Sequence, residues 1–416
     1  MHSEEVRIAD LSASITGRHD SGAACIRILR AAAEMDELRE AWSAWSDQPE
    51  ADLDLFSIHL RHNRGTARPH VMVVYRSDRP NCILVGCLQR GPLVFKVGSF
   101  PLFQPNARIL RFVAGGFLGS RSRENAGILL LAIMNSLQKR EAQAVEFSQL
   151  RVECPLYNLV KTAPNVFCRE HFTPVHTHRY LTLPPTFQAF LRCRSSEGRQ
   201  QYRRYARMLA RDFPGEVKFQ GVRNECDVGD FARNADEISQ KSYQRASGAG
   251  FVNNLETQET LRAAAKNEAL RAYLLYVGER PIAFASGIVC NKSLCGTFTG
   301  YDPAFKRYRP GLQTLMRLIE ESCESHGSVL RIDAGYGDMP YKREFFDSSW
   351  EEGPVWIFAP SWTGLRLHIF RLVSSLLHTA AMWLLARNNR LRKLKRMWQR
   401  KAVPEFRRET FEIGSH

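Results

Sequence analysis

At 416 residues the chain is too long for a single hydrophobic core, so we expect two or three domains. An apolar fraction of 44%, with 24 Phe, excludes a chain that is disordered throughout. The formal charge of +15 is concentrated in residues 192–211 (net +6) and 390–401 (net +7), which excludes a uniformly basic nucleic-acid coat.

The start of the chain and its cysteines predict a cytoplasmic location. Residues 1–20 form a loose acidic leader without the apolar core of a secretory signal. The ten Cys are scattered without a CxxC pair, which favours free thiols in a reducing compartment.

Strands and helices alternate along the first half. We expect a strand at 24–29, helices at 32–45 and 52–63, strands between 73 and 98 and at 108–113, a strongly apolar helix at 125–139 and a strand at 144–150. This alternation is typical of a mixed α/β layer.

One stretch of the first half is repeated in the second. Residues 73–86 (VVYRSDRPNCILVG) and 274–287 (LLYVGERPIAFASG) agree at a constant offset of 201 positions. Each copy predicts a strand, a tight polar turn and a second strand. The repeat favours two related domains in tandem over a common hairpin turn that occurs twice. The matched positions are Tyr75 with Tyr276, Asp78 with Glu279, Arg79 with Arg280, Pro80 with Pro281 and Gly86 with Gly287.

A Pro-Pro pair within 177–190 marks the crossing into the second half. There we expect helices at 199–211, 227–242 and 257–267, strands at 217–222, 271–277, 281–290 and 293–301, a helix at 312–325 and a strand at 328–333. A cationic loop, DPAFKRYRPG, precedes the helix at 312.

The helix at 199–211 places four Arg on one face at four-residue spacing. Because guanidinium groups bind phosphate with paired hydrogen bonds, we expect a substrate-binding surface here. A solvated helix face and a nucleic-acid surface are the alternatives. The residues assigned to this surface are Arg203, Arg204, Arg207 and Tyr243.

Four metal-ligating side chains, Cys168, His171, His176 and His178, lie within eleven residues. Such a group could bind zinc, but its spacing matches no standard finger. We therefore expect a polar interdomain loop and no metal.

The tail combines apolar and basic residues. A helical stripe from Leu365 to Trp383 is followed by a Lys/Arg-rich stretch to Lys401. Its uncharged apolar run, Leu372–Ala386, has 15 residues, fewer than the ~20 that span a bilayer. The pattern is typical of a helix lying in the membrane surface, and we expect peripheral contact of 362–401 with the anionic inner leaflet. The alternative is a helix that packs on the second domain.

The second half, roughly 176–350, resembles the CelD-like acyltransferases of the GNAT superfamily. These are bacterial proteins named for an association with cellulose biosynthesis and related in fold to the FemAB peptidyltransferases. The resemblance rests on RRYARMLA (203–210), LLYVGERPIAFASGIV (274–289), GYDPAFKRYRPGLQTL (300–315) and DAGYGDMPYKREFF (333–346).

The resemblance implies a fold of α/β (α+β) class: tandem GNAT-like mixed sheets flanked by helices, with a basic amphipathic helical tail. The implied boundaries are a leader at 1–20, a degenerate GNAT-like domain at 21–175, a GNAT acyltransferase domain at 176–358 and the tail at 359–416.

The resemblance also implies acetyl-CoA or a longer acyl-CoA as co-substrate, held on a loop of the form Gln/Arg-x-x-Gly-x-Gly/Ala. Here the loop is 308–313, and only its central Gly fits the form. The implied donor-binding residues are Thr297, Thr299, Tyr301, Lys306, Arg307, Arg309, Gly311, Leu312 and Gln313. The implied catalytic residues are Tyr341 as acid, Asp333 and Asp338 as bases, and Lys342 to orient a carboxylate or phosphate.

These observations predict a bacterial cytoplasmic N- or O-acyltransferase. Its acceptor would be an envelope sugar, a lipid or an exopolysaccharide precursor, held by the first domain. A FemAB-type enzyme that uses aminoacyl-tRNA and a non-catalytic scaffold are the alternatives. DNA is not an expected partner, because no recognition helix stands out.

Overall fold

The computed structural model describes residues 5–7, 24–97, 100–242, 245, 250–325 and 327–387. The first half contains β1 (Glu5–Arg7), β2 (Cys25–Leu29), α1 (Ala32–Asp36), α2 (Arg39–Trp45), η3 (Pro49–Ala51), α3 (Leu53–His62), β3 (Ala67–Pro69), β4 (Val71–Arg76), β5 (Arg79–Pro92), β6 (Phe95–Val97), β7 (Phe100–Phe103), β8 (Asn106–Gly119), α4 (Arg123–Gln138), β9 (Ala144–Arg151) and α5 (Pro155–Thr162). Most of the predicted leader at 1–20 lies outside the described residues.

The second half begins at β10 (His176–Thr182). It continues through α6 (Phe187–Arg192), α7 (Ser196–Asp212), β11 (Val217–Val222), η4 (Glu225–Asp227), α8 (Val228–Gln240), α10 (Leu255–Lys266), β12 (Leu270–Val277), β13 (Arg280–Cys290), β14 (Ser293–Tyr301), η5 (Pro303–Tyr308), α11 (Pro310–Glu324), β15 (Arg331–Tyr336), α12 (Pro340–Phe345), β16 (Ser348–Phe358) and α13 (Trp362–Arg387).

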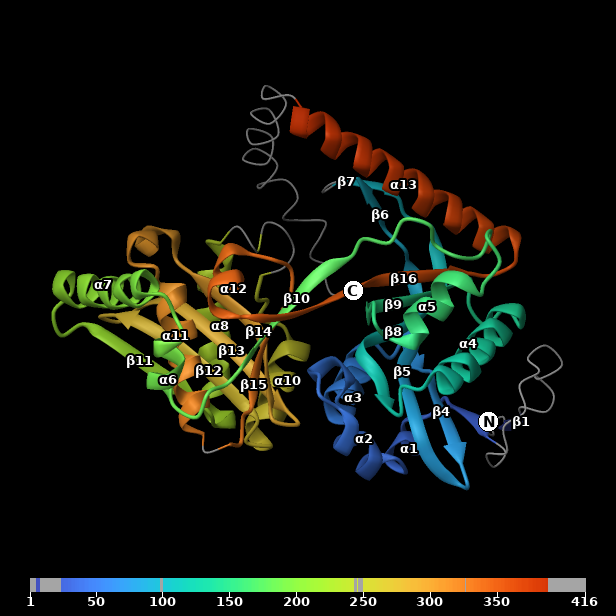
Figure 1. Cartoon of the computed structure of the whole chain (residues 1–416), viewed down its shortest axis with the longest axis horizontal. Coiled ribbons are helices and arrows are strands. Elements are labelled where there is room, and N and C mark those ends of the chain that lie inside the picture. The colour runs from blue at the N-terminus through green and yellow to red at the C-terminus, as the bar shows by residue number, and fades with distance from the viewer. Residues whose placement is uncertain are drawn as a thin grey trace.

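One mixed sheet of 14 strands runs through both halves (Figure 1). Its order is β1-β2-β4-β5-β8-β9-β16-β10-β15-β14-β13-β12-β11, and β3 pairs with β5 beside this path. Separate apolar clusters, one involving α4 and α5 and another α1 to α3, cover the first half, and others involving α8, α10 and α11 cover the second. The predicted class, mixed α/β sheets flanked by helices, is confirmed.

The repeated sequences fold alike. β4 and β5 form the hairpin of the first copy, and β12 and β13 form that of the second. Each hairpin has a bulge just before the Tyr that the two repeats share. The bulge lies between Val74 and Tyr75 in the first copy and between Leu275 and Tyr276 in the second. A bulge at the same repeat position in both copies supports duplication over chance recurrence of a turn.

The glycines of the repeat have the same packing role. An added Cβ would lie 2.7 Å from the Arg111 carbonyl oxygen at Gly86 and 2.9 Å from the Cys295 carbonyl oxygen at Gly287. Both positions lie where the next strand of the sheet passes closely, so only glycine fits without moving that strand.

The strand that joins the halves, β16, was not predicted. It comes late in the chain, yet it pairs with β10 through Ser348–Glu352 and with β9 through Glu352–Phe358. Its register shifts between Gly353 and Val355, and a Cβ on Gly353 would lie 2.3 Å from the Pro174 carbonyl oxygen. The Gly-Pro pair and the acids in this segment interrupt the apolar alternation by which a strand is read from sequence.

The helix predicted at 32–45 is two helices, α1 and α2. The chain turns at Glu37 and Leu38, where the Leu38 amide donates to the Met35 carbonyl at 3.0 Å. Met35 of α1 and Trp42 of α2 both belong to one core cluster.

The tail begins as predicted with a helix. α13 packs its first half through Leu367 and Phe370, and Phe370 stacks on Phe103 at 4.3 Å. Further along, Leu376 and Leu377 are exposed, and α13 extends from the body in Figure 1. No helix in the described part of the chain has the length and apolar character needed to cross a bilayer. The basic stretch at 388–401 lies outside the described residues.

Candidate active site

A pair of parallel strands in the second half separates part-way along its length. β14 and β15 pair only through Ser293–Cys295 and Arg331–Asp333. Beyond Cys295, β14 continues beside β13 to Tyr301, whereas β15 pairs with β10. The strands therefore diverge toward their carboxyl ends, which is where ligands bind in many α/β sheets.

The helix that follows β14 begins at this open end. Arg309 adopts a left-handed conformation (φ 46°, ψ 54°), and Pro310 takes the first helical position. α11 has neither a side-chain cap nor an acid in its first turn. A helix start of this kind leaves its partial positive charge to an external anion.

Gly311 carries the first amide of α11, because Pro310 has none. The amides of Leu312 and Gln313 both bond the Arg309 carbonyl, at 3.0 and 3.4 Å. A Cβ on Gly311 would lie 3.3 Å from the Tyr301 ring. The glycine therefore keeps space for a ligand to approach the backbone here.

Two other predicted donor-binding residues, Gln313 and Thr299, use their side chains to bond the backbone of the protein itself. Gln313 is buried and donates to the Tyr308 carbonyl at 3.0 Å, so its side chain holds the loop rather than facing outward. The Thr299 hydroxyl donates to the Phe284 carbonyl at 3.3 Å, within the sheet. The side chain of Thr297 lies outside what the structure describes.

Cationic side chains surround the start of α11. Lys306, Arg307 and Arg309 are exposed, and the Arg309 guanidinium lies 5.2 Å from the Tyr205 ring centroid on α7. Arg307 pairs with Asp212 at 3.1 Å.

The predicted substrate-binding arginines lie on the same helix as Tyr205. Arg203, Arg204 and Arg207 are exposed, and among the described residues none of them has a carboxylate within ion-pair distance. Tyr243 lies outside the described residues. Helix α7 lies beside the loop before α11, but it packs there through Leu209, which shares a core cluster with Phe305 and Tyr308. The three arginines therefore lie on the other faces of α7.

The four predicted catalytic residues lie on β15 and α12. Asp338 pairs with Arg179 at 2.6 Å and with Arg343 at 2.7 Å, and the hydrogen bond from Arg179 holds the pKa of Asp338 below its ordinary value. Tyr341 is 38% exposed. Lys342 is buried, and its ammonium group donates to the Gly335 and Tyr336 carbonyls at 3.1 and 2.8 Å.

Asp333 belongs to a buried polar network. His178 bonds Asp333 at 2.5 Å through Nε2 and Glu352 at 2.7 Å through Nδ1. Gln48 donates to the second oxygen of Asp333 at 2.8 Å, and the Gly335 amide donates to the first at 2.7 Å. This network ties the first half to β10, β15 and β16.

The network decides the charge states of its members. Burial alone would raise the pKa of Asp333, but the hydrogen bond from His178 brings it below its ordinary value. Burial alone would lower the pKa of His178, but the bonds to Asp333 and Glu352 raise it. Burial lowers the pKa of Lys342 to about 8. Sequence reasoning missed His178 and Glu352 as partners, because residues 174 positions apart leave no local signal.

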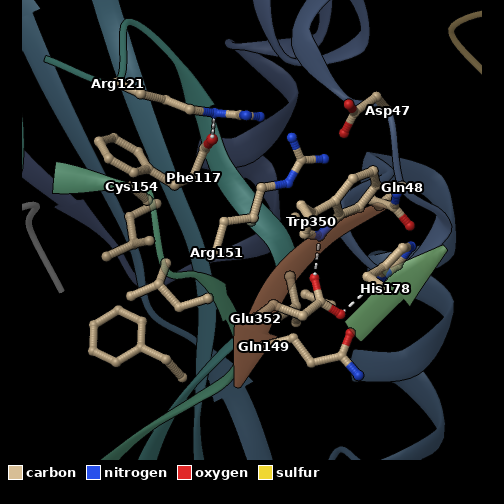
Figure 2. Close-up of a pocket in the computed structure, with 17 residues that line it drawn as sticks. Asp47, Gln48, Phe117, Arg121, Gln149, Arg151, Cys154, His178, Trp350 and Glu352 are labelled. Atoms are coloured by element: carbon tan, nitrogen blue, oxygen red, sulfur yellow. Dashed lines mark hydrogen bonds and ion pairs between the residues drawn. The ribbon is translucent and has the colours of Figure 1, made fainter. Parts of the chain in front are cut away.

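A pocket lies at the corresponding position of the first half. β8 and β9 pair in parallel only through Ile109–Phe112 and Ala144–Phe147, and the pocket opens beyond that point. Its volume is about 60 Å³. Figure 2 shows Arg121, Arg151 and Trp350 lining it, with Gln48 and His178 close to each other on another side.

The Cys/His group at 168–178 divides among different partners. His178 joins the carboxylates, His176 contacts the Tyr336 ring at 5.5 Å, and His171 stacks on His368 at 5.6 Å. Within the described ranges, no group of three or more His, Cys, Asp or Glu side chains is arranged to hold a metal ion.

The comparisons agree with this geometry. Residues 196–343 match the family described as acetyltransferase (GNAT) domain. This stretch contains the diverging strands, the start of α11 and the arginine face of α7. The match supports an enzyme that transfers an acyl group, and GNAT domains use acyl-CoA as co-substrate.

Solved structures are similar in fold over most of the chain. FemX has a TM-score of 0.52 at 9% identity, and the similarity covers 78% of this chain and 95% of FemX. A tandem GNAT protein of the clavulanic acid biosynthesis pathway has a TM-score of 0.49 at 11% identity, with 81% and 99% covered. No curated protein is significantly similar in sequence. The narrower likeness to CelD-like acyltransferases stays a prediction.

Proposed function

We propose that this protein transfers an acyl group from acyl-CoA to an amine or hydroxyl of an envelope sugar, a lipid or an exopolysaccharide precursor. The observation that carries the proposal is the uncapped start of α11, at the open end of a diverging strand pair inside a GNAT-matched segment. Acyl transfer from a thioester needs a positioned nucleophile, a polarised carbonyl and a proton for the departing thiolate.

In this proposal the donor diphosphate binds at the start of α11. The diphosphate accepts from the Gly311 amide, and the exposed Lys306 and Arg309 supply positive charge beside it. The pantetheine arm then runs between β14 and β15 toward Cys295, where the strands meet. Backbone amides of 297–301 polarise the thioester carbonyl.

The proton steps fall to the residues after β15. Tyr341 is our candidate for the acid that protonates the thiolate, and Asp338, which is ionised, is our candidate base. Asp333 has both oxygens bonded, so we assign it a positioning part rather than proton transfer. Lys342 fixes the carbonyls at the end of β15 and so holds Tyr341 in place.

The test is calorimetric titration of the full chain with acetyl-CoA, CoA and a long-chain acyl-CoA. We expect binding of all three, with CoA itself retaining most of the affinity because the diphosphate dominates it. A Tyr341→Phe variant should bind acetyl-CoA normally and lose turnover. No binding at millimolar ligand would contradict the proposal.

The arginine face of α7 favours a second candidate, an aminoacyl-tRNA donor. Arg203, Arg204 and Arg207 are free of carboxylate partners in the described part, as a surface for an RNA backbone requires. Binding of tRNA that weakens steeply with salt, together with no acyl-CoA binding, would select this candidate.

We further propose peripheral contact with an anionic membrane through α13 and the basic stretch after it. Leu376, Leu377 and Trp383 are 49%, 45% and 57% exposed on the part of α13 that leaves the body. Apolar side chains followed directly by a Lys/Arg-rich sequence suit a lipid surface with anionic headgroups.

Vesicle co-sedimentation tests the membrane contact. A Leu376→Asp, Leu377→Asp double variant should lose binding to phosphatidylglycerol vesicles, whereas Leu255→Asp, at a 75% exposed position on α10, should keep it. Equal binding of both variants, or equal binding to neutral vesicles, would contradict the contact.

A further inference from the structure

We infer that the pocket between β8 and β9 binds the anionic end of the acceptor, and that the acceptor is a sugar or polyol carrying a phosphate or a carboxylate. The inference rests on the proposed function, because it names the acceptor class of that reaction. It starts from the pocket's place in the duplicated fold.

The pocket is the first-half counterpart of the donor site, but it is unsuited to CoA. The helix after β8, α4, is capped by Ser122, whose hydroxyl accepts from the Asn125 amide at 3.1 Å. Its first turn also carries Glu124. The Ser122 cap occupies an amide that a diphosphate would need, and the negative charge of Glu124 would repel the diphosphate. The strands still separate here, so space for another ligand remains.

The pocket is lined by two arginines that have no ion-pair partner in the described part of the chain. Among the described residues, Arg121 and Arg151 have no carboxylate within ion-pair distance. Arg121 is held by a hydrogen bond from its Nε to the Phe117 carbonyl at 2.8 Å, and Arg151 lies 3.8 Å from the Trp350 ring centroid (Figure 2). Two guanidinium groups that have no carboxylate partner in the described part of the chain are suited to bind a phosphate or carboxylate.

The acids of the pocket are already engaged, with one exception. Glu352 accepts from the Trp350 indole at 2.8 Å and bonds His178 at 2.7 Å. Asp47 pairs with Arg331 through Oδ2 at 2.9 Å, but its Oδ1 is buried and has no hydrogen-bond partner among the described residues. A ligand hydroxyl or amine would satisfy Oδ1, since a buried acceptor without a donor is costly.

The size of the pocket sets how much of the acceptor enters. At about 60 Å³ it has room for roughly four water molecules, by the ~15 Å³ that each needs. That accommodates one phosphate or carboxylate with an adjoining hydroxyl, and leaves the remainder of the acceptor outside.

The pocket is joined to the strand beside the donor. Gln48 and His178 line the pocket, and both bond Asp333, which lies opposite Cys295 at the last pair before β14 and β15 separate. An acceptor held by its anionic end is thus anchored to the same network that supports the donor site.

Calorimetric titration of the full chain, without any acyl donor, tests the inference. The probes are glucose 6-phosphate, galacturonate and neutral glucose. We expect a charged probe to bind and glucose to bind at least tenfold more weakly. A phosphate-only or a carboxylate-only response identifies which anion the acceptor carries. Equal binding of charged and neutral probes, or no binding of either charged probe, overturns the inference.

Two arginine variants locate the binding. Arg121→Gln and Arg151→Gln should each weaken the charged probe about tenfold, while Arg64→Gln, at an exposed position of the same half, should not. Arg121 is exposed, so its variant should fold even if Arg151→Gln does not. Wild-type affinity in Arg121→Gln would overturn the inference. Acetyl-CoA affinity should be unchanged in Arg121→Gln, so loss of the acceptor site and loss of the donor site are measured separately.

Discussion

The two halves share one architecture but differ at the start of the helix that follows the diverging strand. α4 is capped by Ser122 and has Glu124 at its second position, where α11 has no side-chain cap and Gly311. The same comparison holds where the strands separate. The first half ends its parallel pairing with Phe112 opposite Phe147, and the second ends it with Cys295 opposite Asp333.

This difference is the basis on which we propose the second half as the site for the donor diphosphate. A capped, acidic helix start is satisfied by its own chain, whereas an uncapped start beside exposed cations can accept an external anion. We therefore propose that the two halves are related frames in which different residues at a few positions select different ligands. In our account the second half binds the donor and the first binds the acceptor.

The largest expected effect comes from making α11 resemble α4. Gly311→Glu places in α11 the acid that α4 carries at the same helical position. Repulsion of about 3 kcal/mol for one charge pair at roughly 5 Å should weaken acetyl-CoA binding about 150-fold. Calorimetric titration measures this. The matched control is Glu124→Gly, which should leave acetyl-CoA affinity unchanged, and a strong effect there would break the comparison.

Asp333, the residue that replaces a Phe at the strand divergence, gives the next largest effect. Asp333→Asn leaves His178 with one carboxylate in a buried site, and we expect a loss of about 3 kcal/mol in the free energy of unfolding. Asp338→Asn, at a partly exposed ion pair, should cost less than about 1 kcal/mol in urea denaturation. Equal stability of the two variants would show that the buried network does not hold the halves together.

The two halves should also differ in how their stability depends on pH. The third residue of α12 is Lys342, whereas the third residue of α5 is Tyr157. Burial lowers the pKa of Lys342 from 10.5 to about 8. At a pH between these two pKa values, the Lys342 side chain is protonated in the unfolded chain and largely deprotonated in the folded protein. The free energy of unfolding should therefore rise with pH, by up to ~1.4 kcal/mol per pH unit.

Denaturation of wild type and Lys342→Met at pH 8 and at pH 10 checks this. The wild type should gain stability relative to the variant across the interval. Parallel pH profiles would mean that Lys342 keeps its ordinary pKa.

The smallest effect concerns the arginine before each helix. Arg309→Ala should weaken acetyl-CoA about fivefold, since one exposed cation contributes about 1 kcal/mol near a phosphate. Arg121→Ala, at the start of α4, should leave acetyl-CoA affinity unchanged. If both variants weaken it equally, the two helix starts are not distinguished by the donor.

Much of the fold was readable from the sequence because its signals are local. The repeated hairpin, the apolar helix at 125–139 and the Pro-Gly start of α11 each depend on turn chemistry or periodicity within a few residues. The structure places the hairpins, α4 and α11 within a few positions of the predicted bounds.

The parts that were missed depend on contacts between distant residues. β16 joins the halves by pairing with β10 and β9, which lie about 170 and 200 positions earlier in the chain. The sequence around Gly353 contains no local signal that predicts this pairing. His178 was read as part of a histidine cluster with its neighbours in sequence, whereas its partners are Asp333 and Glu352. The predicted roles of the catalytic and donor-binding residues stay predictions.

A crystal structure of the full chain with CoA bound tests the central claim most directly. We predict that the diphosphate lies at the start of α11, accepting from the Gly311 amide and facing Lys306 and Arg309. Density for the diphosphate between β8 and β9, beside Arg121, would contradict the assignment of the two halves.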